Sequence, residues 1–186
     1  MSEFEFAFSL FGLLLGLALA EGLGGLARAL KASHKVRIGW PTALLGIFVS
    51  CDVVTFWVYG WNMRNLVPFN WPTLFAGFLV TATYYVAASL IFPDDPEEWS
   101  DLDGHFWKQR RRVLGGVLLC NAALLGVVAS FGMMPDPTSI RVLIIVWGIF
   151  PLTAIAAISR SRPLVIAALV ALIALYPLSI FWTSAP

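Results

Sequence analysis

Two carboxylates, Glu21 and Asp52, lie inside long apolar stretches of this 186-residue sequence. A charged side chain in hydrocarbon costs about 2.5 kcal/mol or more, so each acid should face a bundle interior, a partner or water. An acid in such a place can take up and release protons, which is the chemistry that coupled transport needs. The alternative is that both acids are hydrogen-bonded packing groups and that at least one of them is protonated.

The two acids are predicted to lie at the same depth in a membrane. Each is about ten residues from the inner end of its apolar stretch, or about 15 Å along a helix, close to the middle of the hydrocarbon. Antiparallel helices joined by a short loop would make Glu21 and Asp52 neighbours that titrate together. Arg28 follows Glu21 by two helical turns on the same face, too far for direct pairing, and can steer charge toward it or bind a partner.

Further polar side chains fall at comparable depth in the neighbouring stretches. With the two acids they predict a polar cavity that handles protons or ions: Thr55, Tyr84, Tyr85 and Asn121. Pro151 and Pro177 fall inside the last two stretches. A proline in a helix removes a backbone hydrogen bond and kinks the helix, which frees carbonyl groups to line such a cavity.

The apolar stretches are long enough to cross a membrane. Apolar residues make up 59% of the chain and charged residues 12%, whereas about a quarter of a soluble domain is charged. A spanning helix needs about 20 mostly apolar residues. Six segments qualify and predict an all-α membrane protein, a single transmembrane domain over 1–186: roughly 6–30, 41–61, 72–92, 113–133, 141–159 and 163–183. The third loop divides it into two three-helix halves, which would be inverted if they were related.

Lys and Arg are distributed unevenly between the loops, and cytoplasmic loops retain positive charge. Only Arg64 and Arg141 fall on the side of the second and fourth loops. The first, third and fifth loops carry the other ten: Arg28, Lys31, Lys35, Arg37, Lys108, Arg110, Arg111, Arg112, Arg160 and Arg162. The asymmetry predicts that these three loops are cytoplasmic and that both termini lie outside.

The third loop, 93–112, is the one long connection. It opens with six carboxylates and closes with four cations. The simplest interpretation is a solvated linker with acids near a helix start and a basic anchor at the lipid surface. A docking surface for a partner is the alternative, and Asp101, Asp103 and His105 resemble a metal site on paper.

The first apolar stretch is rich in glycine. Gly12 and Gly16 form a GxxxG step, and Gly24 continues the same face. Small residues let helices approach closely, so this face predicts helix packing, either within the chain or between subunits.

Enzyme and cofactor patterns are absent from the sequence. It has no HExxH, histidine box, GxSxG or phosphate-binding glycine loop. His34 and His105 both fall in loops, which excludes an intramembrane haem held by two histidines. Cys51 and Cys120 lie in apolar stretches and are interpreted as core residues. A net charge of +1 gives no basic surface for nucleic acid. We expect no catalysis, cofactor or bound metal.

Several short motifs resemble a bacterial membrane-protein family of unknown activity. They are Glu3-Phe4, Leu15-Gly16-Leu17 with Glu21 and Arg28, Val36-Arg37-Ile38-Gly39-Trp40, Phe56-Trp57, Phe92-Pro93 and Arg110-Arg111. The resemblance covers most of the chain and implies a six-helix protein of the bacterial inner membrane. The family carries an amide near the position of Asp52, so this carboxylate departs from its pattern.

The sequence therefore predicts a proton- or cation-handling transporter or channel, forming an oligomer in the lipid bilayer, with Glu21 as its key ionisable group. The alternative is a non-transporting subunit: a sensor, assembly factor or scaffold. Such a subunit would bind another membrane protein through the first helix and dock partners on the third loop.

Overall fold

The computed structural model describes residues 3–68, 70–99 and 101–183, and side chains within 5–179 apart from residues 69 and 100. The described chain is helical and contains no β-strand, which confirms the all-α prediction. Its elements are α1 (Glu3–Lys31), η1 (Ala32–His34), α2 (Trp40–Asn62), α3 (Trp71–Ser89), η2 (Pro96–Glu98), α4 (Leu102–Ser130), α5 (Ile140–Val142), the π-helical η3 (Leu143–Trp147), α6 (Ile149–Ile158) and α7 (Arg162–Thr183).

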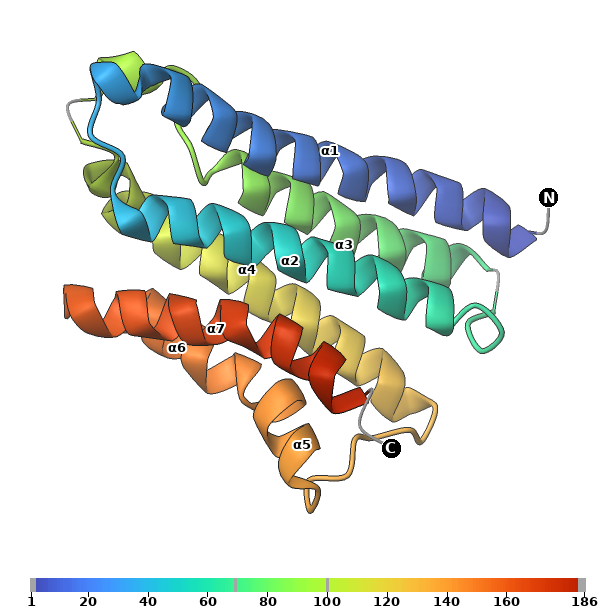
Figure 1. Cartoon of the computed structure of the whole chain (residues 1–186). Coiled ribbons are helices and arrows are strands. Elements are labelled where there is room, and N and C mark those ends of the chain that lie inside the picture. Colours follow the sequence, from blue (N-terminus) through green and yellow to red (C-terminus); the bar gives the residue numbers. More distant parts are fainter. Residues whose placement is uncertain (1–2, 69, 100, 184–186) are drawn as a thin grey trace.

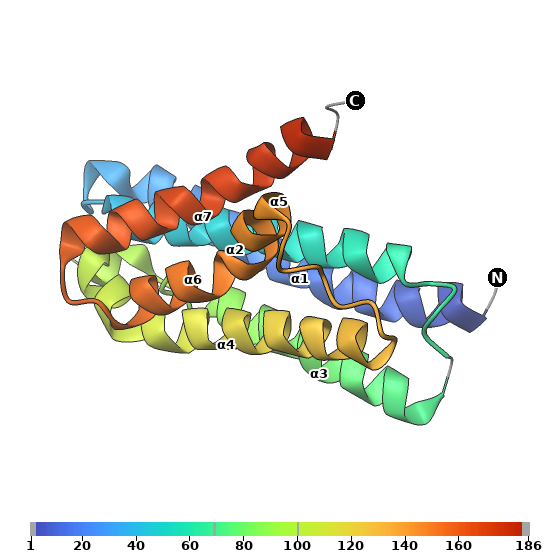
Figure 2. The ribbon, with the colours of Figure 1, turned by 90° about the horizontal axis from the view of Figure 1, so that it is seen from below.

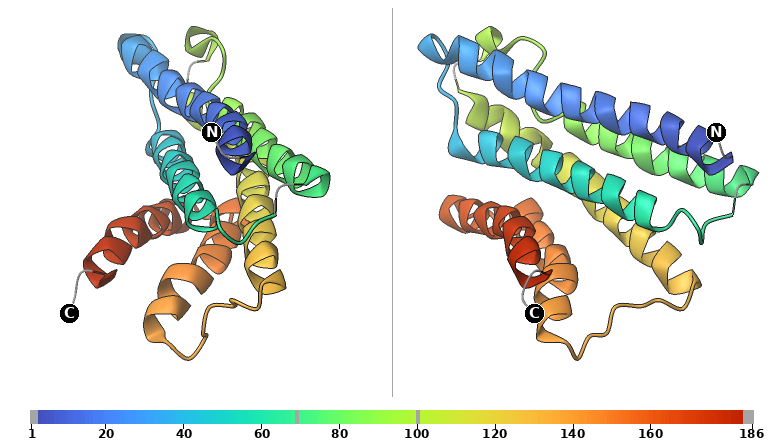
Figure 3. Two further views of the ribbon diagram at one scale, coloured as in Figure 1. Left: turned by 90° about the vertical axis from the view of Figure 1, so that its right-hand side faces the viewer. Right: turned by 45° about the vertical axis from the view of Figure 1, so that its right-hand side comes forward.

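The six longest helices pack in pairs, and the pairs form three layers, which Figure 1 and the right view of Figure 3 show. α1 packs on α3, α2 packs beside α4, and α6 packs on α7. The middle layer touches both others, because α2 contacts α1 and α7 while α4 contacts α3 and α6. The two three-helix segments on either side of the third loop therefore pack against each other.

Five helices are long and apolar enough to cross a membrane: Glu5–His34, Trp40–Asn62, Leu102–Ser130, Ile140–Ile158 and Arg162–Ser179. They coincide with five of the six predicted spans. The third predicted span, 72–92, is α3, which is not among the five. α3 ends at Ser89, and its three threonines and two tyrosines lower its mean hydropathy.

The prediction of a solvated linker over 93–112 is wrong for its second half. α4 begins at Leu102, and the carboxylate of Asp101 caps it by accepting a hydrogen bond of 2.9 Å from the amide of Asp103. Phe106 and Arg110 are buried in this first part of α4. The charged residues of this segment exclude it from the predicted span 113–133. An amphipathic helix needs only one apolar face, so the segment can still be helical.

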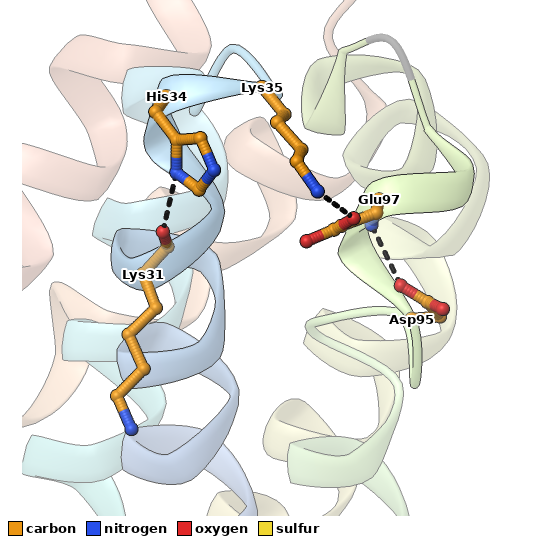
Figure 4. A network of polar contacts seen from close by, with 5 residues as sticks. All are labelled: Lys31, His34, Lys35, Asp95 and Glu97. Carbon is orange, nitrogen blue, oxygen red and sulfur yellow. Dashed lines mark hydrogen bonds and ion pairs between the residues drawn. The ribbon is translucent and has the colours of Figure 1, made fainter.

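Loops one, three and five meet at one end of the bundle. Lys35 and Glu97 form an ion pair of 2.7 Å, drawn in Figure 4. The amide of Leu102 donates to the carbonyl of Arg37 at 3.2 Å, and Arg162 pairs with the buried carboxylate of Asp103. We call this end, where α2, α4 and α7 begin, the interlocked end. The N-terminus lies at the opposite end (Figure 1).

The fifth predicted span, 141–159, is a broken helix rather than a single one. Proline has no amide proton, and its ring conflicts with the carbonyl four residues earlier, which for Pro151 is that of Trp147. The π-helical turn Leu143–Trp147 ends at that residue and α6 begins after Gly148. Pro177 lies inside α7, which continues through it to Thr183. Figure 2 shows the short helices of the fifth span beside α7.

Candidate functional site

Asp52 lies near the middle of α2 and is 3% exposed. Three side chains donate hydrogen bonds to its carboxylate. The Tyr84 hydroxyl and the Asn121 amide donate to Oδ2 at 2.7 and 3.0 Å, and the Tyr176 hydroxyl donates to Oδ1 at 3.1 Å. The donors come from α3, α4 and α7, so one carboxylate joins all three layers of the bundle.

Each donor is held in place by a second contact. The ring of Tyr84 packs against Phe56 with ring centres 5.3 Å apart. The amide of Asn121 also donates to the carbonyl of Val117 at 3.1 Å, one turn earlier in α4. The ring of Tyr176 lies 6.4 Å from that of Phe48. The donor geometry around Asp52 is therefore fixed by packing as well as by the carboxylate.

A cavity of about 440 Å³ opens from Asp52, and we call it the Asp52 cavity. α2, α4 and α7 supply most of its walls, and the π-helical turn and α6 complete them. Near Asp52 it is lined by Asn121, Tyr176 and Thr55. It extends along α2 and α4 as far as the loop residues Leu66 and Pro135. The cavity thus reaches from mid-bundle toward the end opposite the interlocked end.

Asp52 lies between a closely packed half of the bundle and a half that contains the cavity. Toward the interlocked end, the side chains that precede the site on each helix are fully buried: Phe48 and Val49 on α2, Leu114 and Val117 on α4, and Leu169 and Leu172 on α7. In the other direction, the residues that follow the site line the cavity: Thr55, Tyr59 and Asn62, then Leu124, Leu125 and Val128, then Ser179. The carboxylate therefore stands at the closed end of a one-sided cavity.

A second cavity of about 680 Å³ lies on the other side of α2. Leu19 and Leu23 of α1 contribute to it, together with residues of α2 and α7. Five residues line both cavities and lie between them: Thr55, Tyr59, Asn62, Tyr176 and Ser179.

The structure brings three predicted site residues together. Asp52, Tyr84 and Asn121 are directly hydrogen-bonded. Thr55 lines both cavities, but its hydroxyl donates to the carbonyl of Cys51 at 2.9 Å rather than to the carboxylate. Tyr85 is not part of this cluster, and its side chain is 36% exposed. Consecutive residues of a helix point about 100° apart, so Tyr85 points away from the direction of Tyr84.

Glu21 stands apart from this cluster. Its carboxylate pairs with Arg28 at 3.8 Å, and the two side chains are 38% and 46% exposed. The expectation that Arg28 lies too far away for pairing is wrong, because both side chains are long enough to reach along the helix surface. Glu21 lines neither cavity. The hydrogen bonds of Asp52 therefore come from α3, α4 and α7, and none comes from Glu21.

Sequence reasoning missed Tyr176. The residue lies 14 positions after Arg162, the start of α7, and Asp52 lies 12 positions after Trp40, the start of α2. At about 1.5 Å per residue, both therefore lie about 20 Å from the interlocked end. A depth comparison extended to the last helix would have placed Tyr176 at the height of the acid.

The glycine face of α1 packs differently from the prediction. Gly12 faces Trp57, whose ring would be 3.2 Å from an added Cβ, as expected for close packing. An added Cβ at Gly16 would meet nothing within 4 Å, and one at Gly24 would meet only Arg28 of the same helix. The tight contact is at Gly25, where a Cβ would lie 2.6 Å from the ring of Phe92. Contact between subunits through Gly16 stays a prediction.

The metal-like residues of the third loop have structural roles. Asp101 caps α4, Asp103 pairs with Arg162, and Nε2 of His105 lies 3.0 Å from the carbonyl of Leu90. In the described part of the chain, no group of three His, Cys, Asp or Glu side chains is placed to hold a metal ion.

No protein-family model, curated protein or solved structure matches this chain. The resemblance to a bacterial membrane-protein family stays a sequence-based expectation, and the site has to be interpreted from its own geometry.

Proposed function

We propose that this chain is a membrane protein that binds protons or cations at Asp52 and moves them through the Asp52 cavity. In this proposal α3 is a sixth span, since it packs on α1 and α4 and contributes Tyr84 to the site. The proposed setting is a bacterial inner membrane, with the interlocked end cytoplasmic and both termini periplasmic.

The observation that carries the proposal is a buried carboxylate at the closed end of a cavity. A carboxylate offers about four acceptor positions, and three donors occupy positions on Asp52. One position is left for a proton or a cation that arrives through the cavity. No cationic side chain lines the described cavity, so charge balance has to come from such a ligand.

The one-sided shape favours a transporter over an open channel. A channel needs a continuous path, whereas here Phe48, Leu114 and Leu172 are packed without exposure on the far side of the site. A carboxylate that faces one side at a time is what alternating access requires. A transporter would therefore change shape at the interlocked end to release its ligand.

Reconstituted vesicles test the proposal. Proton and monovalent-cation flux would be measured for the wild type, Asp52→Asn and Glu21→Gln under an imposed gradient. We expect wild-type flux above that of empty liposomes, loss of this flux in Asp52→Asn and its retention in Glu21→Gln. Flux that survives Asp52→Asn but is lost in Glu21→Gln would transfer the role to Glu21.

The second candidate function is the non-transporting subunit. Gly16 has open space around it, and its neighbours Leu13 and Leu17 are exposed, so this face of α1 is free to contact lipid or another membrane protein. Wild-type vesicles that carry no flux at acidic or neutral pH would favour this candidate.

A further inference from the structure

The Asp52 cavity combines a single acid with walls that are mostly apolar. Leu124, Leu125 and Val128 line it from α4, and Ile145, Ile149 and Phe150 line it from the broken fifth span. Resting on the proposed function, we propose that the ligand of this cavity is an organic cation with an apolar body, bound with its charge against Asp52.

A small metal cation fits this cavity poorly. It would have to exchange its water shell for several oxygen ligands. Around Asp52, the donors of Tyr84, Tyr176 and Asn121 already point at the carboxylate. The hydroxyls of Thr55 and Ser179 donate to backbone carbonyls at 2.9 and 2.7 Å. The site offers one anionic group, and the other oxygens around it belong to neutral hydroxyls and amides.

An organic cation matches the same walls. Its charge is spread out and weakly hydrated, so little is lost when it leaves water. The rings of Tyr59, Phe150 and Tyr176 line the cavity, and the faces of aromatic rings attract such a charge. A volume of about 440 Å³ lies within the usual range for small-molecule sites, about 300 to 1,000 Å³. The apolar body of the ligand would then fill the space beside Leu125 and Val128.

Direct binding is the test, with tetraphenylphosphonium as the probe. The full chain would be embedded in lipid nanodiscs, and binding to empty nanodiscs would be subtracted. Tetraphenylborate has the same shape and the opposite charge, so it controls for partitioning into lipid. We expect saturable binding of tetraphenylphosphonium at one site per chain and no saturable binding of tetraphenylborate.

Two variants locate the binding. Asp52→Asn keeps an acceptor oxygen for Tyr84 and Asn121, and its new amide can donate to the hydroxyl oxygen of Tyr176. It therefore removes the charge and preserves the hydrogen bonds, and it should weaken binding by about tenfold or more. Leu125→Trp should fill the cavity and abolish binding. Its matched control is Leu119→Trp, since Leu119 lies on the same helix, is 63% exposed and does not line the cavity.

The outcomes separate this inference from the proposed function. Wild-type nanodiscs that bind no tetraphenylphosphonium, or binding that is equal in wild type and Asp52→Asn, would overturn the organic-cation assignment. Proton or monovalent-cation flux in vesicles would then still support the proposed function. A third outcome is that the wild type binds tetraphenylphosphonium, both variants lose this binding, and wild-type vesicles show no flux. This outcome would support the ligand class and contradict the transport function.

Discussion

The hydroxyl of Tyr176 donates a hydrogen bond of 3.1 Å to Oδ1 of Asp52, although the two residues are 124 positions apart in the sequence. The bond ties the last helix to the second in the interior of the bundle. Toward the interlocked end from this bond, α7 packs through apolar side chains such as Leu169 and Leu172. The Tyr176 bond therefore fixes the position of the distal half of α7.

Tyr176→Phe should loosen that half of α7. The ring keeps its contact with Phe48, and only the hydrogen bond is lost. We expect faster amide hydrogen exchange in α7 after Tyr176, with no change in the first part of the helix, because local opening follows local contacts. Hydrogen exchange followed by mass spectrometry measures the effect. Uniform acceleration along α7 would contradict the local role of this bond.

Tyr84→Phe and Tyr85→Phe form a matched pair in adjacent positions. Tyr84 is buried and donates to Asp52, whereas Tyr85 is partly exposed. Loss of a hydrogen bond to a buried carboxyl costs about 1 to 3 kcal/mol. We expect Tyr84→Phe to lower the thermal unfolding midpoint by several degrees and Tyr85→Phe to leave it nearly unchanged. Equal midpoints for the two variants would speak against the bond.

Gly25→Leu and Gly16→Leu test the packing of α1. An added side chain at Gly25 meets the ring of Phe92, which is itself buried, so it cannot be accommodated without moving α1. We expect Gly25→Leu to broaden or shift the size-exclusion peak in detergent and Gly16→Leu to run as the wild type. The reverse pattern would show that Gly16 packs against a second subunit and that the Gly25 contact adapts.

Arg162→Gln should destabilise the interlocked end. Asp103 is buried and pairs with Arg162, so the change leaves a buried acceptor without its partner, at a cost of about 1 to 3 kcal/mol. Arg160→Gln is the control, since Arg160 is exposed two residues earlier. Thermal unfolding in detergent measures both. A larger effect for Arg160→Gln would place the stabilising contact elsewhere in the loop.

Cysteine labelling tests the proposed topology. In a background with Cys51 and Cys120 replaced by alanine, single cysteines would be placed at Thr138 and Ser161, both of which are exposed. We expect a membrane-impermeant thiol reagent to label Thr138→Cys from the periplasm and Ser161→Cys only after the membrane is opened. Labelling of both positions from one side would contradict the proposal that the intervening helix spans the membrane.

The sequence was sufficient for the regions where apolarity alone decides the structure. The predicted spans 6–30, 41–61 and 163–183 differ from α1, α2 and α7 by at most three residues at either end. The start of α4 was missed because the charges between 102 and 112 hide a helix with one buried face. The π-helical turn was missed because Pro151 predicts a break but not the form that the break takes.

The sequence predicts the depth of the site residues along the helices but not the direction in which their side chains point. Asp52, Tyr84 and Asn121 fall at similar heights in the sequence-based prediction, and the structure brings them together. Glu21 falls at a similar height on α1, yet its side chain pairs with Arg28 on a partly exposed face. Height follows from residue counting, whereas the direction of a side chain depends on how each helix is rotated, and packing against its neighbours sets that rotation.

The ion pairs and capping bonds between loops one, three and five also have a mechanical meaning. α2, α4 and α7 are held together where they begin, by the hydrogen bond of 3.2 Å from the Thr42 hydroxyl to the carbonyl of Leu102 and by the Asp103–Arg162 pair. At their other ends they are separated by the cavity. Small tilts of these helices at the interlocked end therefore become larger changes in width at the opposite end. The contacts between the loops thus also control how widely the Asp52 cavity opens.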